Sequence, residues 1–223
     1  DNTGYIIPTP VIKRFLKDYP TVHVHVEYRR SNQVYDDIVS NVVDIGLVAY
    51  PAKDSRLEIV ALRKDPMVLI CHPQHPFAKL KSMKLKQITG QKFVAFEPDI
   101  PTRKALDKTL REESIEVKTV MEFDNIETVK RAVEIDAGIS ILPQTTIAQE
   151  VAKQTLVQLA FEGQEFHRPL AALFKKNKVL SPAMKQSVVR RARWKPRSVS
   201  GPSITNSSSA RSIRCRARSR STS

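Results

Sequence analysis

Residues 120–143, VMEFDNIETVKRAVEIDAGISILP, contain a strand, a helix and a second strand in direct succession. A short apolar strand ends at Phe123, and Asp124 is placed to cap the helix, with Glu127 three residues later as its capping-box partner. Four apolar side chains recur at helical spacing, so the helix is expected to lay one apolar stripe on a sheet: Ile126, Val129, Ala132 and Val133. The charged side chains between them are expected to face water: Lys130, Arg131 and Glu134.

A glycine and a proline mark the end of this crossover. Gly138 is expected to end the helix, and residues 139–142 form an aliphatic strand. Pro143 is suited to the first turn of another helix, because its missing N–H costs little there. The pattern predicts a right-handed unit with parallel strands, and therefore an α/β protein.

The same alternation of helix and strand fills the chain on both sides of the crossover. Residues 8–19 carry an apolar helical face, residues 22–28 alternate as a strand, and Ser31 or Asn32 is expected to cap a helix that runs to Val39. The pattern predicts further strands at residues 44–50, 57–62, 67–72, 93–96, 156–161 and 170–174. It predicts further helices: one capped by Thr102, one after Pro143 and one that Ser181 opens with Pro182. The charged, proline-containing run at residues 64–66 is expected to break a strand and form a hinge.

The net charge of +14 is concentrated at the C-terminal end of the chain. Residues 190–223 contain nine Arg, one Lys and no acidic residue, which leaves +4 for the rest. This Arg/Ser-rich tail has few aliphatic side chains and is expected to be disordered. Two interpretations of it remain open: a basic arm that contacts nucleic acid, or an end without a function.

Composition excludes some classes of protein and some kinds of site. No apolar run approaches the roughly 20 residues of a membrane helix, and the two cysteines form no disulfide framework, which fits a cytoplasmic protein. Cys71, His72 and His75 lie close together, but two prolines stiffen the turn and no second ligand cluster follows, so no metal site is expected. The chain has no nucleophile elbow and no phosphate loop, so we expect neither an enzyme nor a cofactor.

Several stretches together resemble the effector-binding domain of LysR-type bacterial transcription regulators. They occur in the family's order: FLKDYPTVHVHV, VDIGLVAYP, LICHPQHPFA, and then the crossover at residues 120–143. The resemblance covers about residues 2–188. It implies a type 2 periplasmic-binding-protein-like fold: two Rossmann-like α/β lobes joined by two crossover strands, with a ligand cleft between them. A solute-binding protein of a transporter is the alternative on the same fold.

The resemblance also implies a division of the chain and a set of partners. Residues 1–64 with 168–189 would form lobe I, residues 65–167 lobe II, and residues 190–223 the tail. Family members carry an N-terminal winged helix-turn-helix and a linker helix, and this chain begins after both, so DNA would be bound through a part that is not in this sequence. We expect a homodimer or homotetramer, paired through the helix at residues 8–19, and no membrane partner.

The expected effector site follows from the rule that ligands of such sheets lie beyond the carboxyl ends of strands, against helix N-termini. Three junctions fit: Arg30, Ser31 and Asn32; Pro101, Thr102 and Arg103; and Asn125, with Asp124 beside it as a cap. Ser31 and Thr102 match positions where the family places a Ser or Thr, although Arg30 stands where the family often has Gly. Helix dipoles and arginines predict a small anionic effector. Alternatively, the arginines pair with Asp99 or Glu97, and the site is then neutral.

Overall fold

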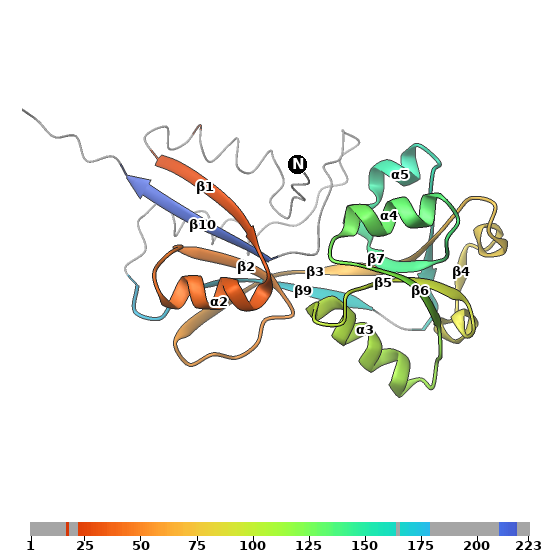
Figure 1. Ribbon diagram of the computed structural model, residues 1–223, viewed down its shortest axis with the longest axis horizontal. Helices are drawn as coiled ribbons and strands as arrows, with labels where there is room; N and C mark the ends of the chain where they lie inside the picture. The colour runs from red at the N-terminus through yellow and green to blue at the C-terminus, as the bar shows by residue number, and fades with distance from the viewer. Residues whose placement is uncertain (1–16, 18–21, 164–165, 179–209, 218–223) are drawn as a thin grey trace, which may run out of the picture. The chain divides into compact units, whose positions relative to one another are not determined.

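The computed structural model describes residue 17 and residues 22–163, 166–178 and 210–217 (Figure 1). These residues divide into two compact units. We call residues 22–63, 169–178 and 210–217 lobe I, and residues 64–163 and 166–168 lobe II. The helices expected at residues 8–19 and from Ser181 lie outside the described residues. Among the helices that are described, none combines the length and the apolar character needed to cross a bilayer.

Lobe I contains a strand, helix and strand in succession, as the alternation at residues 22–50 predicts. Strand β1 (Val22–Arg29), helix α2 (Ser31–Val39) and strand β2 (Ile45–Ala49) follow one another, and β9 (His167–Lys175) pairs antiparallel with β2. Gly46 on β2 lies directly under α2, because a Cβ there would be 2.5 Å from Val34 Cγ1. The core beneath α2 is aliphatic: Val34, Ile38, Val43, Val48, Leu57 and Leu173.

The C-terminal tail contributes a strand to lobe I, which corrects part of the expectation of disorder. Strand β10 (Ala210–Ala217) lies between β1 and β2 and is antiparallel to both (Figure 1). Its side chains show no strand pattern, because ARSIRCRA carries three arginines and few aliphatic residues. Backbone pairing on both sides satisfies the hydrogen-bonding groups of a strand whatever its side chains are.

The structure has one strand where the sequence predicts two, at residues 57–62 and 67–72, with a hinge between them. Strand β3 (Leu57–Cys71) runs without interruption through residues 64–66. The reason is a partner distant in sequence, because Asp65 and Arg168 are both buried and Arg168 Nη2 lies 3.3 Å from Asp65 Oδ2. A charge that suggested a loop is therefore neutralised inside the sheet.

Lobe II is built around the crossover at residues 120–143, whose predicted strands are confirmed as parallel. Strand β5 (Lys92–Phe96) pairs parallel with β6 (Lys118–Phe123), and Phe93 forms a parallel bridge with Ile139, just before β7 (Ser140–Pro143). Strand β5 therefore lies between the two crossover strands. β7 and β8 (Val157–Phe161) pair antiparallel with β3, and β4 (Ser82–Met83) pairs parallel with β8.

Two helices cover opposite faces of the lobe II strands (Figure 1). Helix α4 (Ile126–Glu134) packs its predicted apolar stripe on one face, together with Val68, Ile70, Val94 and Phe96. Helix α3 (Pro101–Glu112) packs on the other face, together with Met67, Leu69, Phe93 and Ala95. Alternate residues of β3 and β5 serve the two faces, as expected for strands covered on both sides. Shorter segments complete the lobe: η1 (Pro76–Lys79), η2 (Leu85–Ile88), η3 (Gln144–Thr146) and α5 (Ala148–Ala152).

The end of α4 differs from the prediction. The helix ends at Glu134, and Asp136 takes the left-handed conformation with φ 58°, so Gly138 does not stop the helix. Gly138 is needed for a different reason, because a Cβ there would lie only 2.6 Å from the carbonyl oxygen of Lys92 on β5. The absence of a side chain lets the chain enter β7 beside β5.

Candidate functional site

Three strands of lobe II end at one edge. Because β5, β6 and β7 run parallel, their carboxyl ends at Phe96, Phe123 and Pro143 share that edge, and the backbone N–H of Glu97 donates to Phe123 O at 3.0 Å. Helices α3 and α4 and the short helix η3 begin there. Ligands of open α/β sheets bind at such an edge. We call this edge, together with the first turns of α3, α4 and η3, the carboxyl edge.

Helix α3 opens two residues earlier than the predicted cap at Thr102 implies. Ile100 is the N-cap and Pro101 the first helical residue, so Thr102 occupies the second helical position and does not cap. The N–H of Lys104 already donates to Ile100 O at 3.1 Å. Helix geometry leaves the N–H groups of Thr102 and Arg103 without an intrahelical acceptor. The Thr102 side chain is buried at this point.

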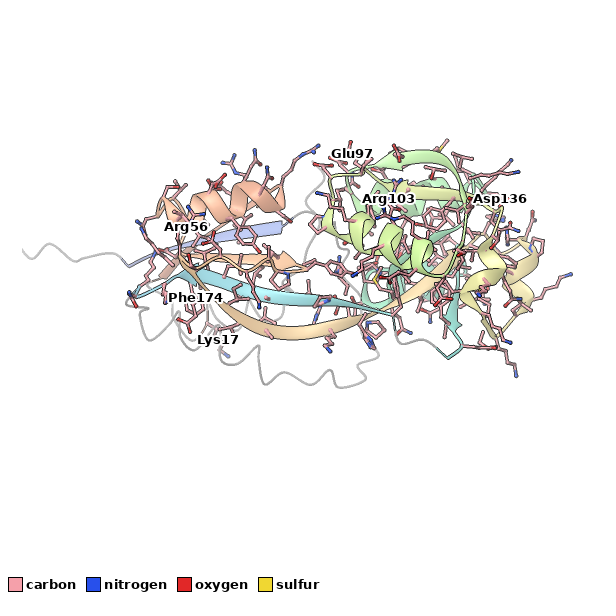
Figure 2. The ribbon with its side chains drawn as sticks, turned by 90° about the horizontal axis from the view of Figure 1, so that it is seen from below. Lys17, Arg56, Glu97, Arg103, Asp136 and Phe174 are labelled. Atoms are coloured by element: carbon pink, nitrogen blue, oxygen red, sulfur yellow. The ribbon has the colours of Figure 1, made fainter. Side chains whose placement is uncertain are left out.

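The Arg103 side chain fastens α3 to strands β5 and β6. Its Nη1 donates to Phe96 O at 2.6 Å and to Glu122 Oε1 at 2.7 Å, and its Nε donates to Asp107 Oδ1 at 2.8 Å. Burial lowers the pKa of Arg103, but hydrogen bonds to Glu122 and Asp107 outweigh it and raise the pKa overall. Its partners are therefore Glu122 and Asp107, and not the expected Asp99 or Glu97 (Figure 2 labels Arg103 and Glu97).

Asn125 caps α4, which corrects the expected role of Asp124. Its Oδ1 accepts from the backbone N–H and the hydroxyl of Thr128, both at 2.9 Å. Its Nδ2 donates to Asp124 Oδ1 at 2.7 Å. The predicted capping box is wrong because the cap lies one residue later. The N–H groups of Ile126 and Glu127 are left without an intrahelical acceptor at the carboxyl edge.

A buried lysine, Lys130, joins α4 to η3 at the carboxyl edge. Lys130 is 0% exposed, although it was expected to face water, because its ammonium finds two hydrogen-bond acceptors and a second carboxylate as an ion-pair partner. Its Nζ donates to Glu150 Oε1 at 2.8 Å and to Thr146 O at 3.3 Å, and lies 2.9 Å from Glu127 Oε1. These contacts connect the first turn of α4 with η3 and α5.

Two residues at the carboxyl edge were missed by the sequence analysis. Gln144 and Thr145 are exposed and follow directly after Pro143 at the end of β7. The sequence predicts ligand-binding residues after the strands that precede α3 and α4, whereas Pro143 at the end of β7 predicts only the start of a helix.

The lobe I candidates lie at the start of α2. Arg30 is the N-cap, so Ser31 and Asn32 are the first and second helical residues, and neither caps the helix as expected. The backbone N–H of Arg30 donates to Gln33 Oε1 at 3.2 Å, which takes over the capping role. The N–H groups of the first turn lack intrahelical acceptors here too. The structure thus brings Pro101, Thr102, Arg103 and Asn125 together in lobe II, and Arg30, Ser31 and Asn32 in lobe I.

A concavity of lobe II lies away from these residues. It encloses about 440 Å³ and is lined by Pro73, Val151, Gln154, Leu156, Val157 and Gln158. Since β3 is antiparallel to β7, the end of β3 at Cys71 lies by the amino end of β7, opposite the carboxyl edge. Burial raises the pKa of the Cys71 thiol to about 11. Within residues 22–163, 166–178 and 210–217, no three His, Cys, Asp or Glu side chains gather as metal ligands.

Solved structures share this architecture. The Synechocystis PCC6803 CcmR regulatory domain in complex with 2-PG matches with a TM-score of 0.74 at 22% identity, over 82% of this chain and 88% of that chain. The BenM effector binding domain with its effector benzoate matches with a TM-score of 0.70 at 14% identity, over 82% and 83%. The predicted fold class is therefore confirmed: the chain has the type 2 periplasmic-binding-protein-like fold.

Sequence comparison then gives the family. The profile of the LysR substrate binding domain matches residues 3–188, and the chain belongs to that family. A RuBisCO operon transcriptional regulator of Allochromatium vinosum is 31% identical over 144 residues, which is 65% of this chain and 48% of that protein. The chain thus spans about half the length of this relative.

Proposed function

We propose that this chain is the effector-sensing domain of a DNA-binding transcription regulator and that its effector is a small anion. The family and the relative's role as a transcriptional regulator support the first part. The carboxyl edge of lobe II supports the second part, that the effector is a small anion. Two helix N-termini open there, and their free N–H groups and positive dipole ends favour a carboxylate or phosphate.

The proposed contacts differ in kind among the candidates. Thr102 and the N–H groups of Thr102, Arg103, Ile126 and Glu127 would bind the anion directly. Arg103 and Asn125 use their polar atoms to hold α3 and α4, so they would position these donors, and Glu122 and Asp107 balance the charge of Arg103. On lobe I, Ser31 and Asn32 in the first turn of α2 would offer an anion the same kind of donors. Benzoate, the effector of the BenM domain, is a carboxylate, which agrees with this chemistry.

Binding would then be transmitted to a DNA-binding part of the parent protein. An anion held by α3 and α4 favours the arrangement in which their first turns face it, because a ligand shifts a protein towards the state that it binds better. The Lys130 contacts would carry that preference to η3 and α5.

The experiment is calorimetric titration of carboxylates, phosphorylated compounds and neutral compounds of similar size. Thr102→Val and Ser31→Ala each remove one hydroxyl, and loss of a charge-assisted hydrogen bond should weaken anion binding roughly ten- to a hundredfold. Thr109→Val and Ser40→Ala are matched controls, because they remove hydroxyls from the far ends of α3 and α2. Binding of neutral compounds only, or equal effects of test and control variants, would contradict the proposal.

A further inference from the structure

Lobe II contains a run of lysines without any acidic residue. Residues 66–96 have no Asp, Glu or Arg but five lysines: Lys79, Lys81, Lys84, Lys86 and Lys92. A sixth, Lys118, is directly opposite Lys92 in the parallel register of β5 and β6. All six residues are exposed. We call these six residues the lysine face.

The lysine face lies at the amino edge of lobe II, away from the carboxyl edge. Lys92 and Lys118 begin the parallel strands β5 and β6, whose starts lie side by side (Figure 1). Strand β3 ends at this same edge, and η1 and η2 follow it in the chain. The backbone N–H of Gln91 donates to Ile88 O at 3.0 Å, which connects η2 with the start of β5.

Buried apolar side chains fix the backbone that carries the central lysines. Met83, Leu85 and Ile88 are buried in the core of lobe II. Lys84 lies between Met83 and Leu85, and Lys86 follows Leu85 directly. The lysines are therefore displayed by a fixed segment, and only their flexible side chains have to be ordered when an anion binds.

The charge of the lysine face is not neutralised within the lobe. In the part of the chain that the structure describes, the ion pairs of lysines are formed by others: Lys108, Lys130 and Lys178. Three acidic residues occur near the amino edge, Glu116, Asp136 and Glu162, and they still leave an excess of +3 over the six lysines. Like charges on opposed residues of neighbouring strands, as at Lys92 and Lys118, destabilise a sheet. A negatively charged partner would remove this repulsion.

The composition of the lysine face fits a nucleic-acid backbone better than a protein surface. The cores of protein interfaces are enriched in aromatic residues, Met and Arg and depleted in Lys. Within residues 76–92 the exposed charges are all lysines, and Leu80 is the one large apolar residue that is exposed, at 40%. Lysine binds a phosphate as a point charge, and contacts to phosphates need no particular base sequence.

We propose that the lysine face binds the phosphate backbone of DNA without regard to sequence. That the DNA is the duplex held by the parent's DNA-binding part rests on the proposed function, whereas the contact with phosphates does not. The effector-sensing domain would then add affinity for DNA through its own surface. Because the lysine face and the carboxyl edge lie at opposite ends of β5 and β6, DNA and effector can be bound at the same time.

Acetylation of lysines tests the proposal residue by residue on the full chain. The chain is treated with an acetylating reagent with and without a short DNA duplex of arbitrary sequence, and the modified lysines are found by mass spectrometry of peptides. DNA should protect the lysine face. Lys53 and Lys176, which are exposed on lobe I, are the matched controls and should react equally with and without DNA.

The salt dependence of DNA binding gives a second measurement. Lys84→Gln combined with Lys86→Gln should reduce the slope of log affinity against log salt by roughly 2, because each lost lysine leaves one phosphate with its counterion. Lys53→Gln combined with Lys176→Gln removes the same charge from lobe I and should leave the slope unchanged. Thr102→Val should also leave it unchanged, so failure of this proposal and failure of the effector proposal are distinguishable.

Several results would overturn the proposal. Protection confined to Lys195, the one lysine of residues 190–223, would assign DNA binding to the Arg-rich tail. Equal protection of Lys53 and Lys176, or equal slopes for the two double variants, would show that the lysine face has no special role. Protection of the lysine face by polyglutamate but not by DNA would assign it to an acidic protein partner.

Discussion

Gly138 offers a sharp test of how the carboxyl edge is built. A Cβ at this position would lie 2.6 Å from Lys92 O, 2.9 Å from the Lys92 carbonyl carbon and 3.2 Å from Lys92 Cβ. The first two atoms belong to the backbone of β5 and cannot rotate away. Lys92 O also accepts the N–H of Ile139 at 2.9 Å, so displacing it breaks the contact between β5 and the start of β7. Gly138→Ala must therefore strain or open the centre of lobe II.

The expected cost of Gly138→Ala is about 2 to 3 kcal/mol in the free energy of unfolding, in the range of overpacked cores. For a chain of this length that corresponds to a fall in Tm of roughly 4 to 12 °C. Urea and thermal unfolding followed by circular dichroism measure both quantities.

A matched control separates steric overlap from backbone strain. Gly163 has φ 73°, but its Cβ would meet nothing within 4 Å. Gly163→Ala should therefore cost only the left-handed penalty of about 1 kcal/mol. If Gly138→Ala is no more destabilising than Gly163→Ala, the close approach of Gly138 to Lys92 does not constrain the fold, and the reasoning is refuted.

Three further changes test other parts of the structure. Gly46→Ala should destabilise lobe I by about 1 to 2 kcal/mol in urea unfolding, less than Gly138→Ala, because the atoms its Cβ meets are the ends of the Val34 and Ile38 side chains. Lys130→Met should cost about 3 to 5 kcal/mol by leaving two carboxylates without their ammonium, and adding Glu150→Gln should recover part of this loss. For Glu134, burial raises the pKa, but Thr155 and Arg131 outweigh it, so the pKa lies below its ordinary value of 4.5. The side chain therefore stabilises the fold above that pH and loses this contribution as pH falls through the depressed pKa, so wild type and Glu134→Gln should converge in stability on acidification.

Sequence periodicity predicted the architecture of lobe II well because its elements are local. The stripe of α4 and the strands on either side of it repeat at helical and strand spacing, and the structure confirms them. Family resemblance added the two-lobed fold class, which periodicity alone does not determine.

The features that were predicted wrongly depend on partners distant in sequence or on single-residue choices. Lys130 is buried because it pairs with Glu150, which lies twenty positions further along the chain. Strand β3 stays continuous because Asp65 pairs with Arg168, which is also distant in sequence. Caps shifted by one residue where two good capping residues are adjacent, as at Asp124 and Asn125. The strand in the tail was missed because backbone pairing leaves no pattern in the side chains.

The central claim is that an anion binds at the carboxyl edge of lobe II, and backbone amide chemical shifts test it most directly. On titration with a carboxylate that binds, the account predicts the largest shifts at the free N–H groups of Thr102, Arg103, Ile126 and Glu127, with an affinity roughly ten- to a hundredfold lower in Thr102→Val. Largest shifts instead around Gln154 and Val157, which line the concavity at the opposite edge, would contradict it.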